Sequence, residues 1–110
     1  MKAAYFEQHG GPEVMKFGEL PDPVAGTGEV LVDIHRASVN GADWKVRAGN
    51  YSQITEFPYI LGRDFSGIVS ALGDGVDEFQ VGDAVFGVCE VGQEGTYAEK
   101  IAMNGSIIAN

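Results

Sequence analysis

The sequence has little cysteine and few basic residues, and both shortages exclude functions. Its 110 residues include one cysteine, Cys89, so no disulfide can form within the chain. Sixteen acidic residues against seven basic ones give a formal charge of -9, which opposes binding to nucleic acid or to an anionic membrane surface. No apolar run approaches the roughly 20 residues of a membrane-spanning helix. Because no basic and apolar leader opens it, the sequence predicts a cytoplasmic protein.

The residues that are present predict one domain made mostly of β-strands. The chain is 45% hydrophobic and long enough to bury a core without disulfides or metal. Short apolar segments alternate with Gly, Pro, Asp and Asn, and helical periodicity is almost absent. The alternation places Val30, Val32 and Ile34 on one buried face. We expect about seven strands, enough to close a small barrel, within residues 2–6, 14–20, 29–36, 65–72, 81–87, 96–103 and 106–109.

One short helix is predicted between Asn40 and Gly49. Asn40 is a favoured N-cap residue, and Asp43, three positions later, is placed to complete a capping box. Gly49 is suited to end the helix. Trp44 is expected to pack in the core.

Two glycine-rich segments follow one another in the second half of the chain. Residues 67–76 read Gly-Ile-Val-Ser-Ala-Leu-Gly-Asp-Gly-Val, and residues 79–86 read Phe-Gln-Val-Gly-Asp-Ala-Val-Phe. Together with residues 37–51 and 62–67, they resemble the N-terminal half-site of the medium-chain dehydrogenase/reductase superfamily. The resemblance is to the zinc-independent branch, which reduces quinones or activated alkenes (enones) with NADPH by hydride transfer. It covers essentially residues 1–110 and implies a mostly β fold, a GroES-like, partly open β-barrel with one or two short helices.

Metal binding is disfavoured at the positions where the alcohol dehydrogenases of this superfamily hold their catalytic zinc. Asn40 stands where those enzymes have a cysteine, and Gly62-Arg63-Asp64 stands where they have Gly-His-Glu. A neutral amide and a permanent cation therefore replace a thiolate and an imidazole, so we expect no metal site. Arg63 is expected to form an ion pair with Asp43 or Asp64.

The resemblance also implies which residues line the reaction cleft. It assigns catalytic roles to Asn40, Asp43, Lys45 and Tyr51, with Asn40 and Lys45 also contacting the cofactor. Each has a plainer alternative. Asn40 and Asp43 are suited to cap the helix, Lys45 to lie on the solvated surface, and Tyr51 to seal an edge of the barrel.

No dinucleotide-binding unit is found in the sequence. Gly26-Thr27-Gly28 runs into a predicted strand, and Gly73-Asp74-Gly75 is a turn without a third glycine or a following helix. The resemblance therefore implies that the Rossmann domain is absent from this chain and that the fragment is inactive alone. The implied partners are that missing domain and a small quinone or enone substrate, in a full-length protein that forms a homodimer.

An alternative interpretation is a co-chaperonin-like small binding barrel without enzymatic activity. Chaperonin-10 proteins share this topology and also carry a Gly-Val-Gly turn followed by Gly-Asp. Against this, they need a long flexible loop with an exposed apolar tripeptide, whereas residues 40–51 here form a compact segment.

Overall fold

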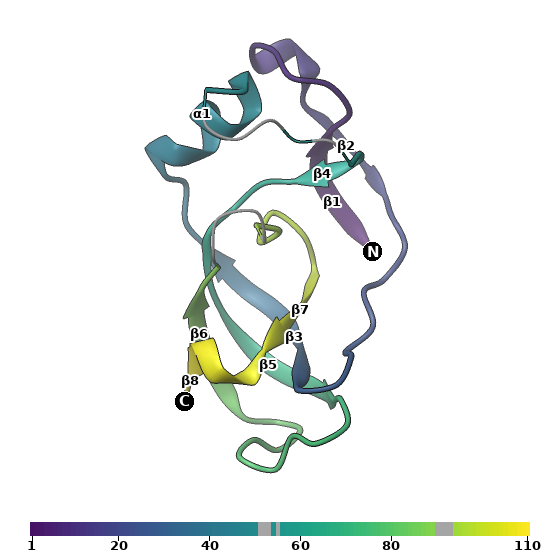
Figure 1. Cartoon of the computed structure of the whole chain (residues 1–110), viewed down its shortest axis with the longest axis vertical. Helices are drawn as coiled ribbons and strands as arrows, with labels where there is room; N and C mark the ends of the chain where they lie inside the picture. The colour runs from purple at the N-terminus through teal and green to yellow at the C-terminus, as the bar shows by residue number, and fades with distance from the viewer. Residues whose placement is uncertain (51–53, 55, 90–93) are drawn as a thin grey trace.

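The computed structural model describes residues 1–50, 54, 56–89 and 94–110. Two antiparallel sheets follow one another along a molecule of 41 × 24 × 23 Å, and the single described α-helix lies beside the smaller sheet (Figure 1). The elements are β1 (Lys2–Phe6), η1 (Pro12–Val14), β2 (Lys16–Glu19), β3 (Glu29–Ala37), α1 (Gly41–Ala48), β4 (Tyr59–Ile60), β5 (Asp64–Leu72), β6 (Ala84–Val88), β7 (Lys100–Asn104), η2 (Gly105–Ile107) and β8 (Ile108–Ala109).

The predicted mostly β, partly open barrel is confirmed by the larger sheet, which curls on itself in the order β7-β3-β5-β6-β8. Its inner face carries an apolar core in which Val30 and Val32 are completely buried, as predicted, while Ile34 packs partly buried against it. Register shifts after Leu31 and after Ile34 bend β3 where it pairs with β5. The remaining buried members of this core are Phe65, Val69, Phe79, Val85, Cys89, Ile101, Met103 and Ile108.

The smaller sheet has the order β2-β1-β4, and β1 and β2, both within predicted strands, pair as an antiparallel hairpin. The two-residue strand β4 was not predicted, because Tyr59 and Ile60 form too short a run to show an alternation. A second cluster of buried residues, Phe6, Val14, Val46 and Leu61, lies between this sheet and α1. The smaller sheet therefore has its own core, which it shares with the helix.

The helix α1 begins after Asn40 and ends at Gly49, as predicted, with Gly49 in the left-handed conformation at φ 83°. It buries the face that carries Asp43 and Val46, which are three residues apart and therefore neighbours on the helix surface. The prediction that Trp44 packs in the core is wrong, since its side chain is 48% exposed. Trp44 directly follows Asp43, so it points about 100° away from the buried face.

The segment from Gly95 to Tyr97 joins the two halves of the molecule. Tyr97 N–H donates to the carbonyl of Leu61 at 3.0 Å, and the carbonyl of Tyr97 accepts from Ala4 N–H at 2.8 Å. Thr96 and Tyr97 are within the strand predicted over residues 96–103, which is observed only as β7. They leave it because their backbone groups bond instead to β1 and to the chain that leads into β5.

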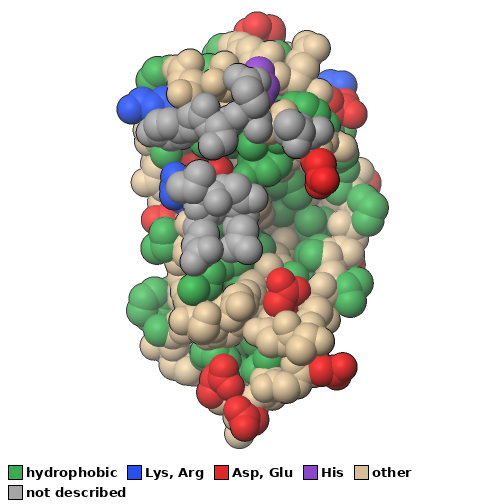
Figure 2. All heavy atoms as spheres, viewed as in Figure 1, with side chains coloured by type: hydrophobic (Ala, Val, Ile, Leu, Met, Phe, Trp, Pro, Cys, Tyr) green, Lys and Arg blue, Asp and Glu red, His purple; other side chains and the backbone are tan. Residues whose placement is uncertain are grey.

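The chain carries an excess of acidic side chains. In the view of Figure 2, acidic side chains are spread over the whole face, and basic ones are fewer. Among the described residues, no helix has the length and apolar character needed to cross a bilayer.

Candidate active site

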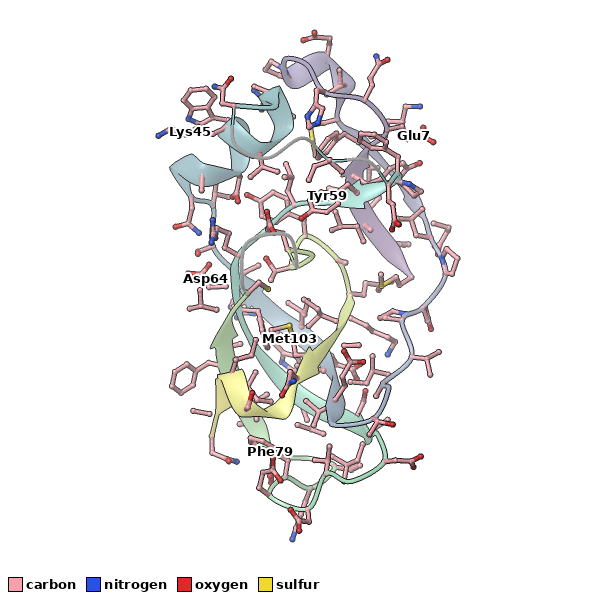
Figure 3. The ribbon with its side chains drawn as sticks, in the orientation of Figure 1. Glu7, Lys45, Tyr59, Asp64, Phe79 and Met103 are labelled. Carbon is pink, nitrogen blue, oxygen red and sulfur yellow. The ribbon has the colours of Figure 1, made fainter. Side chains whose placement is uncertain are left out.

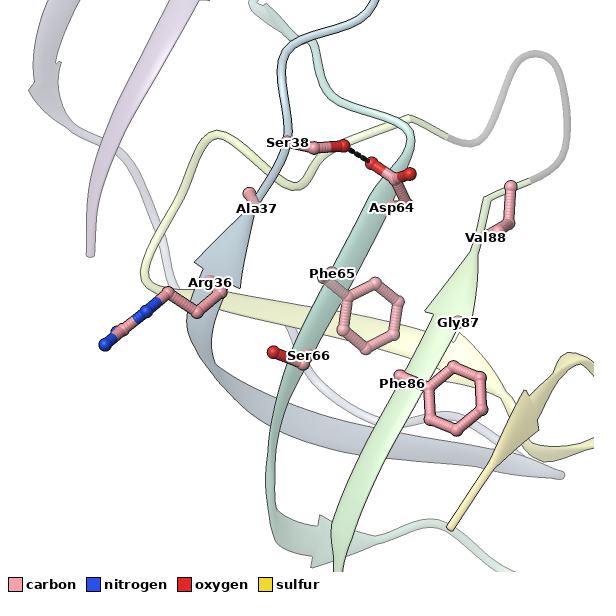
Figure 4. A pocket seen from close by; sticks show the side chains of 9 residues that line it. All are labelled: Arg36, Ala37, Ser38, Asp64, Phe65, Ser66, Phe86, Gly87 and Val88. Atoms are coloured by element: carbon pink, nitrogen blue, oxygen red, sulfur yellow. Dashed lines mark hydrogen bonds between the residues drawn. The ribbon is translucent and has the colours of Figure 1, made fainter.

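The two segments that resemble a half-site in the sequence meet in the structure. The side chain of Asn40, just before α1, donates from Nδ2 to Oδ1 of Asp64, the first residue of β5, at 3.2 Å. It also lies 3.2 Å from Oγ of Ser38, which in turn donates to the same oxygen of Asp64 (Figure 4). An amide, a hydroxyl and a carboxylate are thus gathered where α1 and β5 begin.

Asp43, in the first turn of α1, is buried and only 5% exposed. Its Oδ2 accepts the backbone N–H of Asn40 at 3.0 Å, as the predicted capping interaction requires, and it also accepts the hydroxyl of Tyr97. Its other oxygen, Oδ1, has no hydrogen-bond partner among the described residues. Asp43 therefore fixes the start of the helix with a single oxygen.

Tyr97 is a site residue that the sequence did not reveal. It lies 54 positions after Asp43, and no local pattern connects the two. Burial raises the pKa of the Tyr97 phenol above its ordinary value, and the hydrogen bond to Asp43 raises that pKa further. The phenol therefore stays protonated and remains a hydrogen-bond donor to Asp43 at neutral pH.

Of the other two residues predicted as catalytic, the structure describes only Lys45. Lys45 is half-buried on α1, and its Nζ lies 5.8 Å from the ring centroid of Trp44 (Figure 3). The hydrogen bonds that join Asn40, Asp43 and Asp64 do not include it. Tyr51 lies outside the described residues.

The predicted ion pair of Arg63 is wrong. None of the ion pairs within the described part of the chain includes Arg63, and both expected partners are otherwise engaged. Asp43 binds Tyr97 and the backbone of Asn40, whereas Asp64 binds Ser38 and the side chain of Asn40. Neutral donors stand at both carboxylates in place of the expected guanidinium.

Cys89 packs in the larger core beside the backbone of Arg63. Its N–H donates to the carbonyl of Arg63 at 2.5 Å, and its side chain is 2% exposed. Burial raises the pKa of the thiol to about 11. A thiol held neutral in this way is a packing group rather than a nucleophile.

The groups near Asn40 do not fit a zinc ion. The amide of Asn40 turns its N–H₂ toward Asp64, and the guanidinium of Arg63 has no lone pair to offer a metal. Over residues 1–50, 54, 56–89 and 94–110, no three His, Cys, Asp or Glu side chains gather as a metal site would require. The donor set suits hydrogen bonding to a polar group instead.

A shallow groove of about 390 Å³ adjoins the cluster on the outer face of β3, β5 and β6. Ser38 and Asp64 lie at one end of it, and Phe86 and Val88 line the β6 side (Figure 4). Both of these β6 side chains are more than half exposed, at 56% and 60%.

Comparisons with known proteins show the family of the chain. The alcohol dehydrogenase GroES-like domain family matches residues 26–109. The quinone oxidoreductase of Rattus norvegicus is 38% identical over 100 residues, which are 90% of this chain and 30% of that protein. The solved quinone oxidoreductase from Coxiella burnetii has a TM-score of 0.93 at 34% identity, over 100% of this chain and 36% of that one. The Escherichia coli quinone oxidoreductase complexed with NADPH has a TM-score of 0.91 at 28% identity, over 99% of this chain and 32% of that one.

The chain thus spans about a third of the length of these relatives, and it matches them over nearly its whole length. The comparisons of sequence and of fold agree. The chain belongs to the alcohol dehydrogenase GroES-like domain family, and within the medium-chain dehydrogenases/reductases it is similar to the quinone oxidoreductases.

Proposed function

We propose that this chain is the substrate-side domain of an NADPH-dependent, zinc-independent oxidoreductase that reduces quinones or activated alkenes. The observation that carries the proposal is the hydrogen bond from Asn40 to Asp64, which brings together the two segments where zinc-dependent relatives place their ligands. An amide and a carboxylate in contact there favour hydrogen bonding over metal coordination.

NADPH, when bound, supplies the hydride that a quinone or enone accepts. Asn40 and Lys45 are the residues of this chain that we expect to contact it. The ammonium of Lys45 suits the carbonyl, hydroxyl or phosphate groups of a dinucleotide, and the amide oxygen of Asn40, whose Nδ2 donates to Ser38 and Asp64, suits a hydroxyl or carboxamide N–H. The observation that supports this fit is the position of Asn40, which is held at both its backbone and its side chain. An amide fixed in this way needs no reorganisation when a ligand arrives.

The other residues of the site have supporting roles. Asp43 holds the first turn of α1, Asp64 orients the amide of Asn40, and Ser38 satisfies Asp64. Tyr51, the remaining residue predicted as catalytic, is proposed to offer a phenol or a flat wall to the acceptor ring. Catalysis in this scheme depends on positioning the acceptor and on donors to the oxygen where negative charge develops.

We further propose that the active protein is a longer, cytoplasmic polypeptide that includes a Rossmann domain and forms a homodimer. The share of the relatives covered by this chain supports the missing domain, because about two thirds of each relative lies outside the match. Alone, residues 1–110 lack a partner for most of a dinucleotide, so we expect the isolated domain to be inactive.

The function is tested by replacing Asn40 in the intact protein. Asn40→Ala removes the fixed amide, so kcat/KM for reduction of 1,4-benzoquinone by NADPH should fall about 100-fold. The measurement is the loss of NADPH absorbance with time. Asn50→Ala is the matched control, because Asn50 is an exposed asparagine beyond the other end of α1, and it should leave the rate unchanged.

Two results would contradict the proposal. One is an intact wild-type protein that does not oxidise NADPH with any quinone or enone. The other is an isolated domain of residues 1–110 that does so at an enzyme-like rate.

A further inference from the structure

We propose that Tyr97 is a positioning residue of the candidate active site, whose hydroxyl holds Asp43 and, through it, keeps Asn40 against Asp64. The catalytic part of this inference rests on the proposed function, whereas the positioning itself does not. Tyr97 belongs to neither segment that resembles the half-site in the sequence. Its role emerges only from the contacts that surround it.

The first step is the sharing of one oxygen atom. Oδ2 of Asp43 accepts both the hydroxyl of Tyr97 and the backbone N–H of Asn40. Asp43 is 5% exposed, and its Oδ1 has no partner among the described residues. Without the phenol, the carboxylate would keep one described hydrogen bond, which is costly for a buried charge. It would move toward solvent and take the first turn of α1 with it.

The second step is the anchoring of Tyr97 itself. Its backbone bonds to Leu61 and Ala4, and its ring packs against the cluster that contains Phe6 and Val46. Leu61 lies three residues before Asp64, so the anchor of Tyr97 is close in the chain to one member of the site. The hydroxyl of Tyr97 then reaches Asp43, which lies three residues after Asn40, the other member of the site. Tyr97 therefore spans the two segments whose separation sets the Asn40–Asp64 contact.

The structure offers a matched control in Tyr59. Its hydroxyl also donates to a carboxylate, Oε2 of Glu94, at 2.9 Å, and its ring packs against the same cluster. That hydrogen bond does not involve the residues that begin α1. Tyr59→Phe and Tyr97→Phe thus remove the same chemical group from similar surroundings, and only the second removes a bond to Asp43.

The positioning is measured by hydrogen exchange of the intact protein, followed by mass spectrometry on peptides that contain residues 39–44. We expect Tyr97→Phe to speed exchange there by about 10- to 100-fold, the effect of losing a hydrogen bond to a charged group. Tyr59→Phe should leave exchange of these peptides within about twofold of wild type. No acceleration in Tyr97→Phe, or equal acceleration in both variants, would overturn the inference.

The catalytic consequence has a separate readout. In Tyr97→Phe we expect kcat with benzoquinone to fall about 10- to 100-fold, because Asn40 is displaced, while Tyr59→Phe should leave kcat within about twofold of wild type. An unchanged kcat in an active enzyme overturns the catalytic part. If the wild-type protein does not reduce quinones, the proposed function fails, and the exchange experiment alone then decides the role of Tyr97.

A second variant covers the case in which Tyr97→Phe does not fold. Asp43→Asn keeps the shape of the side chain but weakens its bond to the phenol, and should also accelerate exchange of residues 39–44. Where both single variants fold, the acceleration in the double variant should be smaller than the two single effects combined, because both changes weaken the same bond. Additive effects, or no effect of Asp43→Asn, would show that Tyr97 does not act through Asp43.

Discussion

The larger sheet and the smaller sheet with α1 bury their side chains in different ways. The core of the larger sheet is apolar throughout and includes fully buried Val30, Val32 and Val69. The smaller region also has an apolar cluster, but Asp43 is buried on its helix and is bonded to Tyr97, which packs on that cluster. The candidate active site lies where the two regions meet.

This difference separates what stabilises the domain from what positions its site. Burial of apolar surface depends little on the exact orientation of each group. A buried carboxylate, by contrast, stabilises only the geometry in which its donors are in place. We therefore expect substitutions in the larger core to change the free energy of unfolding most, and substitutions around Asp43 to change the local arrangement more than the global stability.

Phe65 and Phe86 test whether the apolar core of the larger sheet sets the stability of the domain, and this test has the largest expected effect. They lie on the neighbouring strands β5 and β6, with Phe65 5% exposed and Phe86 56% exposed (Figure 4). Phe65→Ala should lower the free energy of unfolding by about 3–5 kcal/mol, through lost burial and the cavity left behind. Phe86→Ala should lower it by less than about 1 kcal/mol. Urea unfolding measures both, and similar losses would mean that the larger core does not set stability.

Substitution of Gly62 tests the packing where the larger sheet meets the smaller sheet and α1. It has a φ of 108°, and a Cβ there would lie 2.8 Å from Cδ1 of Tyr97 and in collision with Oγ1 of Thr96. Gly62→Ala should therefore cost about 1–3 kcal/mol of stability. Gly41→Ala is the control, because a Cβ at this first residue of α1 meets nothing within 4 Å, so the change should be neutral or slightly stabilising. Thermal unfolding of the two variants gives the comparison, which fails if Gly62→Ala is tolerated as well as Gly41→Ala.

The smallest expected effect comes from Cys89, whose contribution to the stability of the larger core should depend on pH. Its pKa in the folded state is raised by burial to about 11 from an ordinary value of 9.0. The folded state thus binds the proton more tightly than the unfolded state, so this contribution is complete below pH 9 and is lost as the pH rises toward 11. Between pH 8 and pH 10.5, wild type should lose about 1–2 kcal/mol more stability than Cys89→Ala. If urea unfolding shows that wild type and Cys89→Ala lose the same free energy of unfolding between these two pH values, the thiol is not desolvated.

Most of the fold could be predicted from local patterns. The alternation that buries Val30 and Val32, and the residues Asn40 and Gly49 that bound α1, act over a few positions in the chain. The exceptions are informative. Trp44 was expected in the core, but a helix can turn only one face to the core and Trp44 lies on another. The strand β4 was missed because two residues are too few to show an alternation of apolar and polar side chains.

The candidate site was predictable only in part. The family resemblance picked out Asn40 and Asp43, and the structure joins them and adds Asp64. The ion pair predicted for Arg63 is not formed, and both carboxylates accept hydrogen bonds from neutral donors instead. Tyr97 could not be found at all, since a tyrosine far along the chain shows no sign of its partner.

By itself the sequence determined most of the strands, the helix with its cap, the acidic charge and the replacement of zinc ligands by an amide and a guanidinium. These follow from side-chain chemistry and from short-range periodicity. Only the tertiary structure decided which distant groups share a hydrogen bond, and so which residues hold Asn40 in place. Hydrogen bonds act over about 3 Å and depend on direction, so a partner remote in the chain is selected when the sheets close on one another.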